Sequence, residues 1–196
     1  HTRFKCDWSS DVCSSDLLPD ARLYYLSSGS EAVEAAMKFA RQVQIARGYP
    51  DRYKVIGRWR SYHGATLGAL GVMGKPSMRQ TYEPMFTDMP RIEPVYCFRC
   101  PYNLEYPSCG LRCADALEDE ILRHGPEQVA AFIAEPIGGA TIGAVVPPDE
   151  YWPRVREICD KYDVLLIADE VMTGMGRVGR WFAIEEWGVT PDIITL

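Results

Sequence analysis

The chain has 196 residues, of which 47% are hydrophobic and 24% are charged, and its formal net charge is −6. This composition is typical of a globular protein and excludes disordered and fibrous classes. The acidic balance, without a run of Lys or Arg, disfavours nucleic acid as a partner. The longest clean apolar run, Val129 to Ala134, is too short to span a membrane. We therefore expect a soluble, cytoplasmic protein with no nucleic-acid or membrane partner.

Both ends of the sequence differ from an ordinary domain boundary. Residues 1–17 are rich in Ser, Asp and Cys, and they have neither a helical nor a strand period. They resemble read-through of a sequencing adapter, so we exclude them as a foreign or disordered tail. At the other end, Asp192 to Leu196 has the pattern of a buried strand, inside which a chain seldom stops. We therefore expect a fragment in which residues 18–196 form part of one domain.

In chain order, short apolar runs alternate with amphipathic helices. The predicted strands are 23–26, 54–59, 129–134, 164–168 and 192–196. The first predicted helix is capped by Ser28 or Ser30, buries Val33, Ala36, Ala40 and Val43, and stops at 48–50. Later helices are predicted after Gly64, over 114–123, and from a cap at Asp149 to about Tyr162, with an irregular excursion over 76–107.

Strands that are apolar throughout and separated by helices predict an α/β fold, with a mostly parallel sheet covered by helices on both faces. In such sheets ligands bind at the carboxyl ends of the strands. The residues that follow the predicted strands, or precede the first helix, are therefore the candidates for a site: Ser28 to Ser30, Tyr62 and His63, Glu135, and Asp169.

Each of these motifs has two interpretations when taken alone. The turn Ser28 to Ala32 can cradle a phosphate at a helix N-terminus, or simply cap the helix. Asp169 ends a buried strand, so its carboxylate needs a partner, which can be a cationic ring nitrogen or a structural ion pair. Tyr62 can stack on a flat ligand, with Gly64 allowing close approach, or can serve ordinary packing. Glu135 is the weakest of the set.

Taken together, the motifs follow a specific order. Ser-Gly-Ser-Glu-Ala, Tyr-His-Gly, Ala-Glu-Pro, Asp-Glu-Val-x-Thr-Gly-x-Gly-Arg and Pro-Asp-Ile-Ile-Thr succeed one another along 18–196. This order resembles the class III aminotransferases, which are pyridoxal-phosphate enzymes of fold type I. The resemblance implies that 18–196 is part of the large, cofactor-binding domain.

The resemblance also implies roles for individual residues toward pyridoxal 5′-phosphate. Gly29 and Ser30, with Ser28 adjacent, would bind the cofactor phosphate through backbone N–H groups. Tyr62 would stack on one face of the pyridine ring, and Val171 would pack against the other.

Further positions would complete the same site. His63 and Gly64 would extend the wall beside the stacked tyrosine. Asp169 would pair with the protonated pyridine nitrogen, so that the ring can accept electrons from the substrate carbon. Glu135 would lie on the substrate side, next to an arginine or a substrate ammonium group.

By the family pattern, the lysine that binds the cofactor covalently falls two positions beyond Leu196. We therefore expect the chain itself to be inactive and the parent protein to be a transaminase that forms a homodimer. Ornithine and 4-aminobutyrate enzymes usually have Gln where Met172 stands, and Gln-Gly-Glu after Glu-Pro, where this chain has 137–140 as Ile-Gly-Gly-Ala. These departures favour the ω-aminotransferase group, with amines and β- or ω-amino acids as donors and keto acids or aldehydes as acceptors.

Two alternatives remain open at this point. Related decarboxylases, aminomutases and racemases share every motif found here. A non-catalytic interaction module, stabilised by zinc and built on the same fold, is the alternative from another class.

The second alternative depends on the cysteines. Seven are present, and Cys6 and Cys13 lie in the excluded tail. Four of the remaining cysteines lie in a cysteine-rich excursion at about 94–113, and they are Cys97, Cys100, Cys109 and Cys113. Their pair spacings are compatible with a four-thiolate structural zinc site, while disulfides or unlinked thiols are the competing interpretations. Cys159, on an amphipathic helix, is predicted to be a buried apolar residue.

Overall fold

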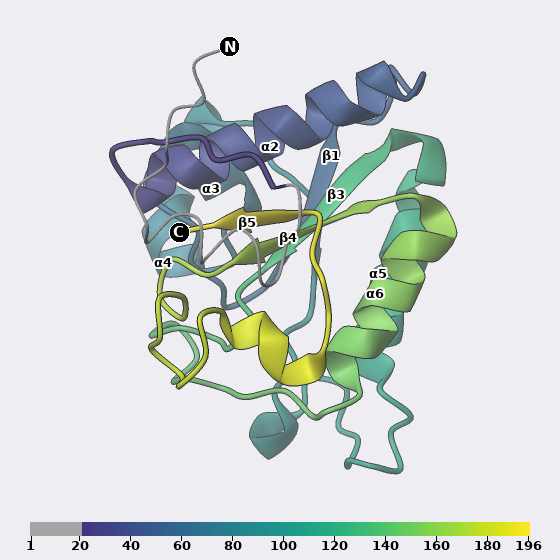
Figure 1. Cartoon of the computed structure of the whole chain (residues 1–196). Helices are drawn as coiled ribbons and strands as arrows, with labels where there is room; N and C mark the ends of the chain where they lie inside the picture. The colour runs from purple at the N-terminus through teal and green to yellow at the C-terminus, as the bar shows by residue number, and fades with distance from the viewer. Residues whose placement is uncertain (1–20) are drawn as a thin grey trace.

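The computed structural model of the protein describes residues 21–196, and the predicted tail at 1–17 lies outside them. Their core is a five-stranded sheet in the order β2-β1-β3-β4-β5 (Figure 1). All four strand pairs are parallel, as predicted. The strands are β1 (Lys54–Arg58), β2 (Arg91–Ile92), β3 (Val129–Ala134), β4 (Leu165–Asp169) and β5 (Ile193–Thr195).

Helices cover both faces of the sheet, which confirms the predicted α/β architecture. Figure 1 shows α2 and α3 on one side and α5 and α6 on the other. The α-helices are α2 (Gly29–Ala46), α3 (Leu67–Val72), α4 (Pro76–Arg79), α5 (Arg112–His124) and α6 (Tyr151–Tyr162). Short 3₁₀ helices are η1 (Gln80–Met85), η2 (Cys97–Arg99), η3 (Pro126–Gln128) and η4 (Ala183–Trp187).

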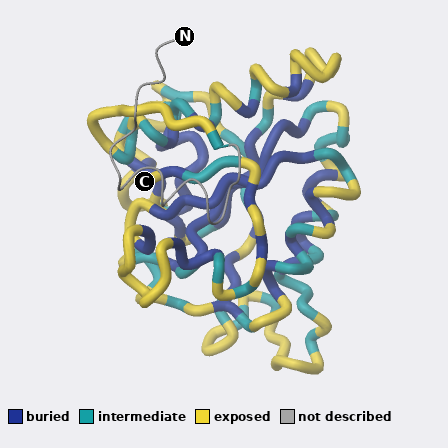
Figure 2. Tube along the Cα trace, in the orientation of Figure 1, coloured by how far each residue is buried: buried dark blue, intermediate teal, exposed yellow. Residues whose placement is uncertain are grey.

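The central strand β3 divides its side chains between two hydrophobic cores. Phe132 packs into the core that contains residues of α5 and α6, whereas Ala131 and Ile133 pack into the core that contains residues of α2 and α3. Successive side chains of a strand point to opposite faces, so both faces must be apolar when both are covered. Figure 2 shows the sheet as a buried layer between the helices on its two sides. Truncating Phe132 to Ala would cost about 3–5 kcal/mol of stability.

The segment before α2 differs from its prediction as a strand. Residues 23–26 form no regular structure, and all four side chains are exposed. Instead of pairing with a strand, the segment contacts α2 through an edge-to-face pair of Tyr24 and Phe39, whose ring centroids are 5.2 Å apart. An apolar run becomes a strand only where a neighbouring strand can accept its backbone hydrogen bonds.

Three further details differ from the sequence prediction. On α2, Val43 is exposed and Gln44 is buried in its place. The Gln44 amide reaches the carbonyl oxygens of Ala130 and Asp163 at 3.1 and 2.9 Å, so its burial leaves no polar group unpaired. The N-cap of α6 is Glu150 rather than Asp149.

The third difference is the excursion predicted to be irregular, which contains the short helix α4 and the strand β2. Strand β2 is only two residues long and pairs with the end of β1, and no alternation of apolar and polar residues can be read over such a length. Within residues 21–196, no helix is both long and apolar enough to cross a membrane.

Candidate functional site

The carboxyl ends of the strands bring the predicted site residues to one edge of the sheet. Asp169 ends β4 and lies opposite Thr195, which ends β5. Glu135 directly follows β3, and residues 61–64 follow β1. Parallel strands place all their carboxyl ends at the same edge, so residues more than a hundred positions apart in sequence become neighbours.

Asp169 is the most thoroughly fixed side chain of this edge. Its Oδ2 lies 2.7 Å from Nδ1 of His63, and the two residues are both buried. Its Oδ1 accepts hydrogen bonds from the Val171 backbone N–H and the Thr195 hydroxyl, each at 3.2 Å. A buried carboxylate is stable only when such donors surround it. The structure therefore holds a negative charge in one orientation at the end of β4.

The structure gives His63 a contact that the sequence did not predict. Its side chain is buried and faces Asp169. A carboxylate can only accept, so the imidazole Nδ1–H donates to it. The other ring nitrogen, Nε2, is buried and has no hydrogen-bond partner among the described residues. His63 thus acts on the site through Asp169.

The N-terminus of α2 faces the same edge. Ser28 is its N-cap, and its Oγ accepts a hydrogen bond from the Glu31 N–H at 3.3 Å while its carbonyl accepts one from Ala32 at 2.9 Å. The predicted capping role of Ser28 is therefore confirmed. The N–H groups of Gly29 and Ser30 precede these two and stand at the open end of the helix, where the helix dipole favours an anion.

Two glycines allow the loops after β1 and β4 to pack directly against the start of α2. A Cβ on Gly29 would lie 2.8 Å from Cγ1 of Val171, in the loop after β4. A Cβ on Gly64 would lie 2.6 Å from Oγ of Ser30, and Gly64 also has a φ of +123°, which disfavours any side chain. The Ser30 hydroxyl accepts a hydrogen bond from the Ala65 N–H at 3.0 Å. The loops after β1 and β4 are thus locked onto the start of α2.

Two apolar side chains remain open to solvent beside this buried charge. Tyr62 is 38% exposed and Val171 is 42% exposed, although their neighbours His63 and Asp169 are almost fully buried. Large apolar groups that stay accessible beside a fixed buried charge are a feature of ligand sites. Tyr62 directly precedes His63, which contacts Asp169, and the Val171 N–H donates to Asp169, so both apolar residues lie close along the chain to groups that touch this charge.

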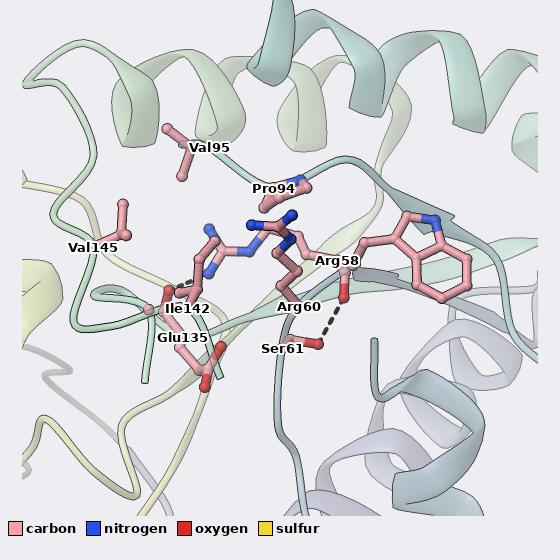
Figure 3. Close-up of a pocket in the computed structure, with 10 residues that line it drawn as sticks. Arg58, Arg60, Ser61, Pro94, Val95, Glu135, Ile142 and Val145 are labelled. Atoms are coloured by element: carbon pink, nitrogen blue, oxygen red, sulfur yellow. Dashed lines mark hydrogen bonds between the residues drawn. The ribbon is translucent and has the colours of Figure 1, made fainter. Parts of the chain in front are cut away.

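Glu135 lies at the rim of the same edge and depends on a buried arginine. Nη2 of Arg58 donates to the Glu135 carbonyl oxygen at 2.6 Å, and the Glu135 carboxylate extends away from that guanidinium (Figure 3). Burial raises the pKa of Glu135, while the charges of His63 and Arg58 and the backbone N–H of Tyr62 act in the opposite direction. Glu135 is therefore a carboxylate whose protonation is sensitive to the groups around it.

Sequence reasoning missed three residues that support this edge. Thr195 and Arg58 contact Asp169 and Glu135 as described. Glu170 is fully buried, and it accepts hydrogen bonds from the Thr173 hydroxyl and from the Ile184 N–H, the latter at 2.8 Å. A polar residue at the end of an apolar strand was the available indication for Arg58 and Thr195. Nothing local could show which partner each would meet.

The cysteine loop, residues 94–113, begins beside Arg58 and Glu135, since Pro94 and Val95 line a cavity with them, but its cysteines line a different cavity (Figure 3). Cys97, Cys100, Cys109 and Cys113 are free thiols that line one cavity. Within residues 21–196, no three His, Cys, Asp or Glu side chains are arranged so that they could hold a metal ion. The predicted zinc site is therefore not present as a formed centre. Cys159 is a free, fully buried thiol in the core, as predicted.

Comparisons with known proteins place this arrangement in a family. The family model described as Aminotransferase class-III matches residues 7–196. The chain belongs to the class III aminotransferases. The family match begins at residue 7, inside the segment that we excluded as a tail, and the boundary at residue 18 stays a prediction.

Individual class III relatives align with most of this chain. It is 40% identical over 177 residues to the hypotaurine/taurine–pyruvate aminotransferase of Paracoccus denitrificans, covering 89% of this chain and 38% of that protein. It is 38% identical over 184 residues to the putrescine–pyruvate aminotransferase of Pseudomonas aeruginosa, covering 93% and 40%. An amine transaminase from an uncultivated Pseudomonas species, solved in its PLP-bound form, superimposes with a TM-score of 0.84 at 40% identity, covering 89% of this chain and 39% of that one.

The chain therefore spans about two fifths of the length of these relatives. Its residues fit the family cofactor, pyridoxal phosphate, on three observations. A buried carboxylate is fixed by hydrogen bonds and can meet a ring cation. At the N-terminus of α2, Gly29 fits against Val171 because it has no Cβ, and the backbone N–H groups there are available to a phosphate. Exposed apolar side chains stand beside both.

Proposed function

We propose that the chain is the cofactor-binding part of a pyridoxal-phosphate-dependent transaminase. The whole protein would move an amino group from an amine or a β- or ω-amino acid to a keto acid or an aldehyde. The observation that supports this proposal best is Asp169, a buried carboxylate fixed by His63, Thr195 and the Val171 N–H.

The residues of the strand-end site would divide the binding of the cofactor among them. Gly29 and Ser30, beside Ser28, would hold the phosphate with backbone N–H groups. Tyr62 and Val171 would flank the ring. Gly64 contributes by allowing the loop after β1 to touch α2, since any side chain there would strike Ser30.

Asp169 would hold the proton of the ring nitrogen. A carboxylate that already accepts hydrogen bonds from two sides cannot turn away, so its charge stays directed at one position. His63 and Thr195 are positioning residues in this scheme, because they contact Asp169 and act through it. When bound, the cofactor supplies an electron-accepting ring for the substrate carbon that loses its proton.

Glu135 would meet the cationic part of the substrate or an arginine of the complete protein. Its carboxylate is buried, and Arg58 and His63 offset only part of the cost of that burial, so its pKa stays raised. A further cation beside it would favour the charged form. Glu135 is thus the candidate for selecting donors that carry an ammonium group.

The substrate class follows from the relatives and from two departures in sequence. Two relatives are named for pyruvate as acceptor, with taurine or putrescine as donor. Met172 and the segment 137–140 depart from ornithine and 4-aminobutyrate enzymes. We therefore propose primary amines and ω-amino acids as donors, with pyruvate as the first acceptor to test. We also propose that the whole protein is a cytoplasmic homodimer.

The experiment compares Asp169→Asn with the unchanged protein. In the 196-residue chain, binding of pyridoxal phosphate is titrated by quenching of the intrinsic fluorescence. In the full-length protein, transfer of the amino group from putrescine or taurine to pyruvate is measured as alanine formed. Loss of the fixed charge should lower transfer by roughly 100-fold or more, with the fold retained.

Asp149→Asn is the matched control, because it removes an equal charge from an exposed position away from the strand ends. It should leave cofactor binding and amino transfer unchanged. If Asp169→Asn binds the cofactor and transfers the amino group as well as the unchanged protein, Asp169 is not the partner of the ring nitrogen. Loss of carbon dioxide from an amino acid, without transfer to pyruvate, would instead indicate a decarboxylase.

A further inference from the structure

Arg58, at the end of β1, differs from other arginines whose side chains are buried. Three of those pair with a carboxylate: Arg52 with Asp163, and Arg79 and Arg91 with Asp88. Arg58 is only 4% exposed, and it reaches no carboxylate at ion-pair distance among the described residues. A buried charge without a counter-ion is costly, and an apolar side chain of similar volume is often at least as stable. Packing alone therefore does not account for an arginine at this position.

The contacts of Arg58 converge on the loop that carries Glu135. Its Nη2 donates to the Glu135 carbonyl oxygen at 2.6 Å (Figure 3). Its guanidinium carbon lies 5.8 Å from the centre of the Trp152 ring, a distance at which an aromatic face attracts a cation. The Trp152 indole N–H donates in turn to the Pro136 carbonyl oxygen at 3.1 Å. Side chains from β1 and α6 thus anchor two successive carbonyl groups, those of Glu135 and Pro136.

The Glu135 carboxylate turns away from Arg58 and toward the strand-end site. Figure 3 shows it extending from the anchored main chain on the side opposite the guanidinium. The Tyr62 backbone N–H stabilises its negative charge by a hydrogen bond. A Cβ on Gly139 would lie 2.9 Å from its Oε1, so the glycine leaves room for the carboxylate. Glu135 is therefore held at its main chain by Arg58 and at its carboxylate by the loop after β1.

The charged groups around this carboxylate do not all have partners of their own. Burial raises the pKa of Glu135, whereas His63 and Arg58 lower it and the charge of Asp169 raises it. His63 already donates to Asp169 at 2.7 Å, so its effect is divided between two carboxylates. Tyr151, a titratable group beside Arg58, is fully buried, and burial raises the pKa of its phenol, so it stays neutral. The positive charge of Arg58 is therefore left to act on Glu135.

We propose that Arg58 is a positioning residue for Glu135: its hydrogen bond fixes the Glu135 main chain, and its unpaired charge holds the carboxylate ready to meet a cation. Arg58 acts through Glu135 and contacts neither substrate nor cofactor in this scheme. The inference rests on the proposed function where the amino donor is concerned, because the cation would be the ammonium group of a protonated primary amine. The coupling between Arg58 and Glu135 does not depend on that function.

A role confined to anchoring the loop is the competing explanation. Trp152 provides an anchor of that kind, because it holds the Pro136 carbonyl without contributing a charge. Trp152→Phe should therefore loosen the loop and leave the electrostatics of Glu135 unchanged. Arg58→Met, which removes an anchor together with a charge and keeps an unbranched side chain, should change both. The two variants form a matched pair.

The first measurement follows proton binding by Glu135 in the 196-residue chain. Urea unfolding free energies are measured between about pH 4 and pH 8, with and without Glu135→Gln, in the unchanged, Arg58→Met and Trp152→Phe backgrounds. A raised pKa in the folded state stabilises the chain at low pH, and this stabilisation is lost as pH rises through the folded value. In Arg58→Met it should persist to higher pH than in the unchanged chain. In Trp152→Phe it should end at the same pH as in the unchanged chain.

Two further substitutions keep this measurement decisive. Arg58→Lys retains the charge, so it should restore the pH dependence of the unchanged chain. If circular dichroism shows that Arg58→Met has not folded, Arg58→Gln removes the same charge and leaves a polar side chain in its place.

The second measurement uses the full-length protein and amino transfer from putrescine to pyruvate. At neutral pH, Arg58→Met should lower kcat/KM for putrescine roughly 10-fold, chiefly through KM, which is the effect of losing one polar contact of ordinary strength. The value for pyruvate should stay unchanged, because a keto acid carries no ammonium group. Arg58→Lys should recover most of the loss.

Three results would overturn the inference. They are the same pH dependence in Arg58→Met as in the unchanged chain, an equal shift in Trp152→Phe, and an equal loss of kcat/KM for putrescine and pyruvate. If the unchanged full-length protein transfers no amino group, the proposed function fails, and the unfolding measurements still decide whether Arg58 acts on Glu135. Failure of the inference and failure of the proposed function are therefore distinguishable.

Discussion

The strand-end site around Asp169 and the cysteine loop at 94–113 both gather polar side chains from separate parts of the sequence, but different forces position them. At the strand ends, register sets Asp169 opposite Thr195, and each oxygen of the carboxylate has a donor. In the cysteine loop, three of the four cysteines lie in backbone turns and Cys113 lies in the first turn of α5, and no metal-holding arrangement exists among the described residues.

This difference separates a carboxylate that the sheet holds in one orientation from free thiols that lie in a largely irregular loop. The strand-end site keeps its charge oriented because a sheet and two packed loops fix its donors, so little reorganisation remains when a ligand binds. The cysteine loop has few such constraints, because residues 94–111 contain no helix or strand other than the short η2. Substitutions that disturb packing should therefore harm the first region more than the second.

The largest expected effect comes from adding a methyl group to a glycine of the strand-end site, and the same change in the cysteine loop is the comparison. Gly64→Ala places a Cβ 2.6 Å from the Ser30 hydroxyl at a φ of +123°, and should lower the free energy of unfolding by roughly 3 kcal/mol. Gly110→Ala, at a φ of +57° with open space around it, should cost only about 1 kcal/mol. Urea unfolding of both variants measures the two values. Equal losses would show that the strand-end site is no more tightly packed than the loop.

A smaller effect should follow from removing one donor to Asp169. Thr195→Val keeps the shape of the side chain but leaves Oδ1 of Asp169 without its hydroxyl donor, which should cost about 1.5 kcal/mol. Affinity for pyridoxal phosphate should fall as well, because the carboxylate is less fixed. Thr173→Val, which removes a donor to Glu170 instead, is the control. It should reduce stability while leaving Asp169 and cofactor affinity unchanged.

If both threonine variants lose cofactor affinity equally, the effect is a general one of packing at this edge. Fluorescence titration with pyridoxal phosphate, performed beside urea unfolding of the same samples, distinguishes the two results.

The smallest effect concerns the pH dependence of stability at Glu135. Its pKa is raised in the folded chain, chiefly by burial, so the folded state binds a proton more tightly than the unfolded state. The stabilising contribution is fully present below the ordinary glutamic acid value of 4.5 and is lost as pH rises through the raised value. The unchanged chain should therefore gain stability relative to Glu135→Gln as pH falls through this window.

Unfolding free energies of both chains, measured across that window, check the sign. Glu105→Gln, which removes an exposed carboxylate from the cysteine loop, corrects for the change in net charge. The raised pKa would be contradicted by a stability difference between the two chains that stays constant with pH. It would also be contradicted if the unchanged chain lost stability relative to Glu135→Gln as pH falls.

Much of the fold was predictable because its strands are buried on both faces. Such strands appear in sequence as continuous apolar runs, so 129–134 matched β3 at both ends. The prediction was wrong at 23–26 because an apolar run without a neighbouring strand stays irregular. It missed β2 because two residues are too few to show a period.

By itself, the sequence determined the four longer strands, the main helices, the cap at Ser28 and the position of Asp169 at a strand end. These depend on local rules: apolar periodicity, side chains that cap helices, and the tendency of ligand groups to follow strands. Only the tertiary structure decided that His63 faces Asp169, that Thr195 supports the same carboxylate, and that Arg58 reaches Glu135. These contacts join residues 106, 26 and 77 positions apart, and only the parallel register of the sheet brings such partners together.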